Sequence, residues 1–254
     1  MKAYNYKKYD SFTDMYQDIL CDLLDHYEYK IAPRGFPVRE ITNVSVLMNP
    51  SNVDIEFINT KAPERQAVYD KYKKNELEWY LSGNTLASSA PSKFWHQLAD
   101  TKGHITSNYG HMMLFDPVYP PLQEYDVIND QYLTPFEKVI ETLIKDPDSR
   151  QAIVHYNVPN HCWPGNKDFP CTMSSQLLIR NGKLHMSTLM RSCDIFLGFT
   201  YDVCWNAHFM GMVFDRLKES GFSLELGELT MNFGSLHMYE KNLEIIERIC
   251  EPAN

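Results

Sequence analysis

The sequence lacks the features that would place the chain in a membrane, outside the cell or on nucleic acid. No apolar run is long enough to span a bilayer, and the N-terminal segment has no apolar stretch like that of a signal peptide. The six cysteines form no C-x-x-C pair, the nine histidines form no H-x-x-x-H pattern, and the formal net charge is −9. These absences predict a cytoplasmic protein with mostly free thiols, no metal, no membrane contact and no nucleic-acid partner.

What the chain does contain is ordinary globular composition. Of its 254 residues, 44% are hydrophobic and 22% are charged, and the length suffices for one large domain. We find no internal repeat, no low-complexity run and no Gly/Ser-rich linker, so residues 1–254 are expected to form a single domain. A few well-placed arginines in this acidic chain would still be enough to bind a phosphorylated small molecule.

Two kinds of hydrophobic spacing predict the secondary structure. Spacing of three and four residues predicts helices at 11–27, 65–81, from about Thr134 to before Asp146, 200–218 and 238–249. Short alternating or apolar runs predict strands at 41–48, 151–157, 175–181, 184–190 and 228–234, with a hairpin turn at Asn181-Gly182. The mixture predicts an α+β fold with helices on one face of a sheet. An apolar second face would need a partner, for which a symmetric dimer is the common solution.

Cys171 is the first candidate for chemistry. It lies in a short segment that contains proline and polar residues, which is typical of an ordered turn facing a cleft. A thiol is a useful nucleophile only as the thiolate, which a nearby guanidinium such as that of Arg191 would stabilise. Taken alone, Cys171 also fits an inert buried cysteine, and Trp79 and Trp95 also fit core side chains.

Six short segments place Cys171 in a wider pattern. They are Asn75–Tyr80, Ser107–Gly110, Asp146–Arg150, Cys171–Thr172, Arg191–Asp194 with Gly198, and Asn232–Tyr239. In order and spacing, from about residue 70 onward, these segments resemble the thymidylate synthase superfamily, and most of all its deoxycytidylate hydroxymethylase branch. The resemblance implies a thymidylate synthase-like α+β fold, with helices packed on a mixed sheet whose other face forms a homodimer interface. It also implies a pyrimidine nucleoside monophosphate as substrate and 5,10-methylenetetrahydrofolate as co-substrate.

The resemblance assigns catalysis to four residues. Cys171 would add to C6 of the pyrimidine and make C5 nucleophilic toward the methylene group of the folate. Glu76 would organise water and move protons around the ring, and Tyr109 would lie near C5, where a proton must leave. Asp202 would bind the edge of the base.

The same resemblance assigns the 5′-phosphate to a group of basic and hydroxyl side chains. Arg191, together with Ser192, would bind the phosphate and keep Cys171 ionised. Arg150 would reach the phosphate from the neighbouring subunit, and Arg34 would reach it from a loop. Gln151 departs from the family pattern, which has a second arginine there.

The sugar and the folate have separate candidates. His237 and Tyr239 would hydrogen-bond the sugar hydroxyl. Asp194 would meet the pterin ring of the folate, with Gly198, Trp95 and Trp79 beside it.

Asp202 indicates which base is bound. Thymidylate synthases carry an asparagine there, whose amide donates to O4 and accepts from N3–H of uracil. Cytosine presents the opposite pattern, with an acceptor at N3 and a donor at the 4-amino group. A carboxylate accepts from that amino group, its protonated form donates to N3, and the ionised form would face O4 of uracil with like polarity. The sequence therefore favours cytosine.

Four differences from the synthases favour water over hydride in the second step. Hydride transfer needs a dry, closed site. The segment after Trp95 lacks the second tryptophan of the synthases, and the sequence as given ends without their apolar tail. Thr172 stands where the synthases have histidine, and the segment Gly198–Trp205 resembles the hydroxymethylases. These differences predict a 5-hydroxymethyl product.

Several alternatives stay open at this point. The enzyme could be a cytidylate C5-methylase or a uridylate-directed relative, and the sugar could be ribose, as in CMP, or deoxyribose, as in dCMP. A remote alternative from a different class is a non-catalytic regulator that binds a nucleotide or RNA.

Overall fold

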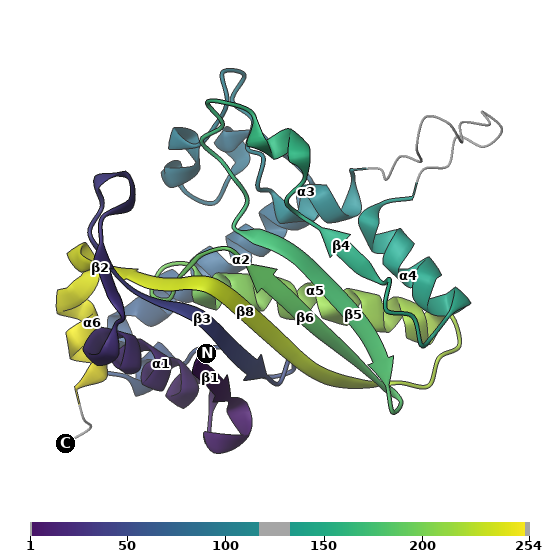
Figure 1. The fold of residues 1–254 in the computed structure, drawn as a ribbon, viewed down its shortest axis with the longest axis horizontal. Coiled ribbons are helices and arrows are strands. Elements are labelled where there is room, and N and C mark those ends of the chain that lie inside the picture. The colour runs from purple at the N-terminus through teal and green to yellow at the C-terminus, as the bar shows by residue number, and fades with distance from the viewer. Residues whose placement is uncertain (1, 117–132, 252–254) are drawn as a thin grey trace.

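A mixed sheet runs through the computed structural model, which describes residues 2–116 and 133–251 (Figure 1). Its eight strands are β1 (Lys2–Asn5), β2 (Tyr29–Ile31), β3 (Val38–Met48), β4 (Ile153–His155), β5 (Thr172–Arg180), β6 (Lys183–Met190), β7 (Cys193–Asp194) and β8 (Glu225–Tyr239). The main order is β1-β3-β8-β6-β5-β4, while β2 pairs with β3 and β7 pairs with β8. Parallel pairs (β1 with β3, β6 with β8, β7 with β8) are mixed with antiparallel ones, as the predicted α+β class requires.

Helices cover one face of this sheet. They are α1 (Phe12–His26), α2 (Gln66–Ser82), α3 (Tyr109–Leu114), α4 (Pro135–Lys145), α5 (Phe199–Glu219) and α6 (Leu243–Cys250). In Figure 1, strands β5, β6 and β8 lie in front of α2 and α5. The core forms between these layers, where Phe199 of α5 packs on Phe233 of β8 and Trp205 packs on Phe209 further along α5. No helix of the described residues is long and apolar enough to cross a membrane.

Most predicted elements are confirmed where local sequence signals are strong. Helix α4 begins with a capping box between Thr134 and Glu137 and has proline at its first position. The β5–β6 hairpin turns at Asn181 and Gly182, whose φ angles of 52° and 71° are those of a type I′ turn.

Several boundaries differ from the prediction, most of all at the end of β8 and the start of α6. Strand β8 extends to Tyr239, and α6 begins only at Leu243 rather than at 238. The reason is tertiary, because Met238 and Tyr239 pair with Arg39 and Val38 of β3. At 151–157, only three residues, those of β4, pair with β5.

The expectation of mostly free thiols is wrong for one pair of cysteines. Cys21 of α1 and Cys250 of α6 form a disulfide with a Cα–Cα distance of 5.4 Å. They are 229 positions apart in sequence, so no spacing pattern could reveal the pair. The packing of α1 against α6 brings them together, while Cys162, Cys171, Cys193 and Cys204 are free.

Candidate active site

The segment before Cys171 is fastened to the start of α3. The backbone N–H and the hydroxyl of Ser107 donate to the buried carboxylate of Asp168, at 2.7 and 2.5 Å. Two residues after Ser107, the hydroxyl of Tyr109 accepts from the backbone N–H of Thr172 at 3.2 Å. Tyr109 is therefore held beside Cys171, and its own O–H remains available to a ligand.

Asn108 and Gly110 bring α3 against the end of α2. Asn108 caps α3 with its Oδ1 and donates from Nδ2 to the carbonyl of Asn84 at 3.0 Å. A Cβ at Gly110 would overlap the carbonyl oxygen of Tyr80, so the backbones meet at a distance that only glycine permits. Each residue of the Ser107–Gly110 motif thus has a structural task.

Gly110→Ala is expected to lower the free energy of unfolding by about 3 kcal/mol, because Tyr80 must shift to admit the methyl group. Gly211→Ala is the matched control, since a Cβ at this position in α5 meets nothing within 4 Å. The control should be neutral or up to about 1 kcal/mol more stable. Urea denaturation of both variants measures the difference, and equal stabilities would show that the α2–α3 contact yields easily.

Arg191 follows β6 and holds the segment that carries the nucleophile. Its backbone N–H donates to the carbonyl of Cys171 at 2.8 Å. Its guanidinium donates to the carbonyls of Pro170 at 3.0 Å and Phe169 at 2.7 Å, and lies 3.4 Å from the hydroxyl of Ser192. The side chain is exposed, so positive charge sits beside Cys171 and stays accessible to an anion.

Burial raises the pKa of the Cys171 thiol above its ordinary value, and the negative charges of Asp202 and Asp168 act in the same direction. Arg191 and a hydrogen bond from Ser192 oppose this shift without cancelling it. The expectation that Arg191 keeps Cys171 ionised is therefore corrected for the unliganded site. Cys171 is a thiol there at neutral pH, and it must lose its proton during the reaction.

Two carboxyl groups follow from the thiol into the protein, because the charge of half-buried Asp202 acts on both Cys171 and the buried Glu76. Burial, assisted by the charge of Asp194, raises the pKa of Asp202 in the first turn of α5 to about 7. Burial and the charge of Asp202 raise the pKa of Glu76 in α2 to about 8, against the effect of the Tyr72 hydroxyl. Below these pKa values both carboxyl groups are protonated and donate hydrogen bonds, unlike ordinary surface carboxylates.

Asp194 has one oxygen occupied and one free. Its Oδ1 accepts from the backbone N–H groups of Phe196 at 2.9 Å and Leu197 at 3.1 Å. Its Oδ2 is buried and has no hydrogen-bond partner within residues 2–116 and 133–251. Such an atom fits an N–H donor from a bound ring, as the pterin of a folate would offer. Gly198 packs closely between Asp194 and Asp202, because a Cβ there would lie 3.3 Å from the carbonyl of Asp194 and from Oδ2 of Asp202.

The two tryptophans predicted beside the folate have different environments. Trp79 is 3% exposed, and its indole N–H donates to the carbonyl of Asn84 at 2.7 Å. Trp95 packs over it with ring centroids 5.0 Å apart and donates to the hydroxyl of Tyr72 at 3.3 Å. Trp95 is half-buried and could contact a ligand, whereas Trp79 supports it from the core.

The sugar candidates adjoin the folate candidate through strand pairing. Asp194 of β7 is the register partner of His237 of β8, whose ring lies 5.5 Å from that of Tyr239. Burial, with the nearby charges of Arg191 and Arg34, lowers the pKa of His237 to about 4. His237 is therefore neutral at physiological pH, with one nitrogen that donates and one that accepts.

The remaining two arginines are placed differently. Arg34 lies in the turn Pro33–Gly35 with a left-handed φ of 53°, a strained conformation for a residue with a long side chain. Its charge helps to lower the pKa of His237, so Arg34 lies on the same side of the molecule as the predicted sugar contact. Arg150 is exposed after α4, where its carbonyl accepts from Gln176 of β5, and no hydrogen bond or ion pair among the described residues joins it to Cys171.

With this geometry established, comparison with known proteins identifies the fold. The family model for thymidylate synthase matches residues 14–253. The chain belongs to the thymidylate synthase family. It is 32% identical over 190 residues to the deoxycytidylate 5-hydroxymethyltransferases of Enterobacteria phages T4 and T2, which covers 71% of this chain and 72% of each relative. The phage T6 protein of the same name is 31% identical over the same length.

Family membership supplies the reaction class. Thymidylate synthase family enzymes use methylenetetrahydrofolate as co-substrate and transfer a one-carbon unit to a pyrimidine nucleotide. Asp194 pairs with His237 between strands, and the charge of Arg191 acts on His237, so these three predicted ligand contacts lie together.

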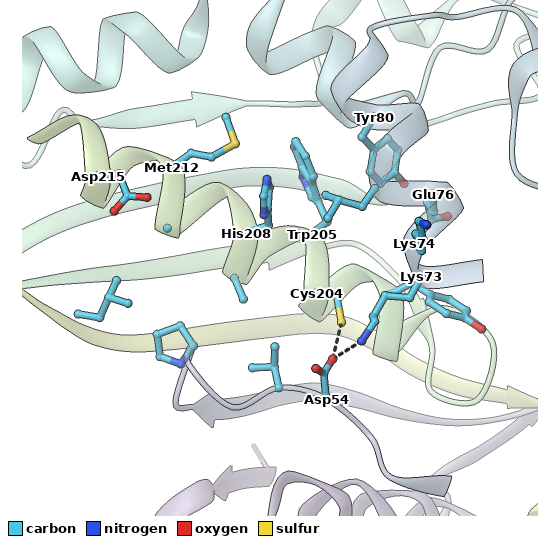
Figure 2. Close-up of a pocket in the computed structure, with 17 residues that line it drawn as sticks. Asp54, Lys73, Lys74, Glu76, Tyr80, Cys204, Trp205, His208, Met212 and Asp215 are labelled. Carbon is cyan, nitrogen blue, oxygen red and sulfur yellow. Dashed lines mark hydrogen bonds and ion pairs between the residues drawn. The ribbon is translucent and has the colours of Figure 1, made fainter. Parts of the chain in front are cut away.

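A groove of about 580 Å³ lies beside this thymidylate synthase site and follows α5 (Figure 2). Figure 2 shows Lys73 and Cys204 both directed toward Asp54 in its middle. Glu76 and Tyr80 line one end, but Cys171 and Asp202 do not line it. The groove therefore reaches the candidate site only through Glu76 and Tyr80 of α2. It is separate from any space above Cys171.

Sequence reasoning missed several residues that build the site. Asn206 donates to the carbonyl of Asp202 at 2.8 Å and accepts from Thr188 of β6 at 2.8 Å, which fastens the first turn of α5 to the sheet. Tyr72 precedes Glu76 by one helical turn, and that spacing was the available signal. Cys193 had no signal beyond its place in a motif, yet its thiol contacts Asp202.

Proposed function

We propose that the chain transfers a one-carbon unit from 5,10-methylenetetrahydrofolate to C5 of a cytidine monophosphate and hydrates it to the 5-hydroxymethyl nucleotide. dCMP is the favoured substrate, and CMP is the alternative. The observation that carries the proposal is the half-buried carboxyl of Asp202, which is hydrogen-bonded to Cys193 and whose pKa of about 7 lets it act as donor and acceptor toward cytosine. The names of the phage relatives support the same base and product.

The covalent step uses the thiol described above. Cys171 loses its proton, its sulfur adds to C6, and the electron pair of the C5–C6 bond moves toward C5. C5 then bonds to the methylene carbon of the co-substrate. When the C5 proton leaves and the carbon–nitrogen bond to the folate breaks, tetrahydrofolate is released with that proton, and a methylene group remains on C5.

Water completes the reaction. Its oxygen adds to the methylene carbon, the electron pair returns to the C5–C6 bond, the Cys171–C6 bond breaks, and the proton of the water is released. Glu76, protonated below about pH 8 and buried beside Asp202, is suited to exchange protons with the ring and the water. Tyr109, held by Thr172, would do the same near C5.

The uncovered sheet face supports a homodimer. On the face away from α5, β5 presents half-buried Gln176 and Leu178, β8 presents half-buried Asn232, and Leu189 of β6 is 47% exposed. Arg150 lies against β5 through Gln176, outside its own site, so a partner subunit could receive it. A monomer in analytical ultracentrifugation at working concentration would contradict this part of the proposal.

The test is to incubate purified protein with the folate and dCMP, CMP or dUMP, and to identify products by mass spectrometry. The expected result is 5-hydroxymethyl-dCMP. A methyl product would indicate the cytidylate C5-methylase, and a preference for dUMP would overturn the choice of cytosine. If the protein releases the C5 hydrogen from none of the three nucleotides, the non-catalytic regulator is favoured.

Glu76→Gln is expected to abolish most turnover while stabilising the fold at alkaline pH. Folding raises the pKa of Glu76 from 4.5 to about 8. The stability that protonated Glu76 contributes to the wild-type fold is therefore fully present below pH 4.5 and is lost as pH rises to 8. Glutamine cannot ionise. The variant should therefore gain about 2–4 kcal/mol relative to wild type between pH 5 and pH 8 in urea denaturation.

Glu78→Gln is the control for this prediction. Glu78 lies two residues further along α2, is exposed, and meets only Lys74 at 3.9 Å among the ion pairs of the described chain. Its variant should keep wild-type turnover and the wild-type pH dependence of stability. A parallel pH dependence for Glu76→Gln and wild type would show that Glu76 ionises as readily in the folded protein as in the unfolded chain.

A further inference from the structure

Cys193 touches the carboxyl group on which the choice of base rests. It lies in β7 and is 2% exposed, and its sulfur is 3.5 Å from Oδ2 of Asp202. Gly198 closes the same side, because a Cβ there would lie 3.3 Å from that oxygen. Within the described residues, Cys193 is the one side chain that hydrogen-bonds to the Asp202 carboxyl, and this bond involves only Oδ2.

A protonated carboxyl without a fixed proton position does not distinguish cytosine from uracil. If the proton sits on the oxygen that faces N3, the group donates to N3 of cytosine and accepts from its 4-amino group. If the proton sits on the other oxygen, the group donates to O4 of uracil and accepts from its N3–H, as an asparagine amide does. Something outside the carboxyl must therefore select one of the two arrangements.

The thiol of Cys193 supplies that asymmetry. Burial and the charges of Asp202 and Asp194 raise the pKa of Cys193 well above its ordinary value, so the group keeps its S–H. An S–H that donates to Oδ2 makes Oδ2 the accepting oxygen and leaves the acid proton on Oδ1. The carbonyl of Asp194, 3.7 Å from the same sulfur, is a weaker competing acceptor.

We propose that Cys193 is a positioning residue that sets base specificity by holding the proton of Asp202 on Oδ1. Oδ1 then donates to N3 of cytosine, and Oδ2 accepts from the 4-amino group as well as from the thiol. This inference rests on the proposed function and names the side chain that makes the site prefer cytosine over uracil.

Other titratable groups around Asp202 act on its charge and not on which oxygen holds the proton. From α2 these are Glu76 and Tyr80, from α3 Tyr109, from the start of β5 Cys171, and from β7 Asp194. Cys193 is distinct because its hydrogen bond to Asp202 lowers the pKa of that carboxyl. Removing the thiol should therefore raise the pKa of Asp202 as well as free the position of its proton.

The experiment compares Cys193→Ala and Cys193→Ser by the ratio of kcat/KM for dCMP over dUMP, measured from release of the C5 hydrogen. Cys193→Ala should lower the ratio about tenfold, the size of one lost hydrogen-bond preference. Cys193→Ser, which keeps a donor, should restore it. In the alanine variant, the pH above which dCMP affinity declines should also move upward.

Cys204→Ala is the matched control, because Cys204 of α5 is a half-buried free thiol whose carboxylate neighbour is Asp54, away from the site. It should leave ratio and pH profile unchanged. If Cys193→Ala does not fold, Cys193→Val replaces it, with equilibrium binding of dCMP and dUMP as the measurement. An unchanged ratio in a folded variant of a dCMP-using enzyme overturns this inference alone, whereas a wild type that prefers dUMP overturns the proposed function.

Discussion

Cys171→Ser is expected to lower turnover by at least about 10⁴-fold and to stop release of the C5 hydrogen from the nucleotide. A serine hydroxyl is a far weaker nucleophile than a thiolate at neutral pH, so the bond to C6 does not form. Without that bond C5 stays electron-poor and cannot attack the methylene carbon. Hydrogen release and product formation should therefore disappear together.

The environment of Cys171 makes this variant informative. The side chain is half-buried and its carbonyl is held by the backbone N–H of Arg191, so the substitution removes the sulfur without removing the fold. Circular dichroism and dCMP binding should match wild type. Cys162→Ser is the control, since Cys162 is an exposed free thiol nine positions earlier, and it should retain full turnover. Full turnover in Cys171→Ser would remove the covalent mechanism altogether.

Asp202→Asn is expected to move the ratio of kcat/KM for dCMP over dUMP by about 10³-fold toward dUMP. An amide donates at one end and accepts at the other, which matches O4 and N3–H of uracil. The wild-type carboxyl, with its proton held on Oδ1, cannot donate to O4 of uracil, whereas the amide can turn its NH2 toward O4 and gain both bonds. The effect is large because burial, which raises the pKa of Asp202 to about 7, also removes the water that would otherwise compensate.

This variant also has a pH signature. In wild type, dCMP affinity should fall as pH rises above about 7, because Asp202 then loses the proton that it donates to N3. Asparagine does not titrate, so this decline should be absent in Asp202→Asn. Titration calorimetry between pH 6.5 and pH 9 measures both affinities. Asp215→Asn, at the exposed end of α5, is the control, and an unchanged base preference in Asp202→Asn would refute the argument for cytosine.

Local sequence signals were sufficient for much of the fold. The capping box at Thr134, the Asn181-Gly182 turn and the apolar spacing of α1 and α5 each involve residues within a few positions of one another. Backbone preference and helix or strand periodicity act over that range, so the elements could be predicted before their packing was known. The order of six motifs likewise indicated the thymidylate synthase family, which the comparison confirmed.

Features that depend on distant segments were not accessible in the same way. The last residues of β8 could not be assigned from their own sequence, because their pairing with β3 joins positions about 200 apart. The Cys21–Cys250 disulfide depends on α1 meeting α6, and the contact of Cys193 with Asp202 depends on β7 lying beside the first turn of α5.

The candidate site shows the same division between what is local in the sequence and what depends on tertiary packing. Motif order is local information, so the family resemblance could propose Cys171, Asp202, Glu76 and Arg191 as nucleophile, base contact, proton carrier and phosphate ligand, and these roles stay predictions. Their protonation states are not local, because a pKa sums desolvation and charge from every element packed around the group. Burial by α2, α5 and the sheet keeps Cys171 a thiol and raises the pKa values of Asp202 and Glu76 toward neutrality.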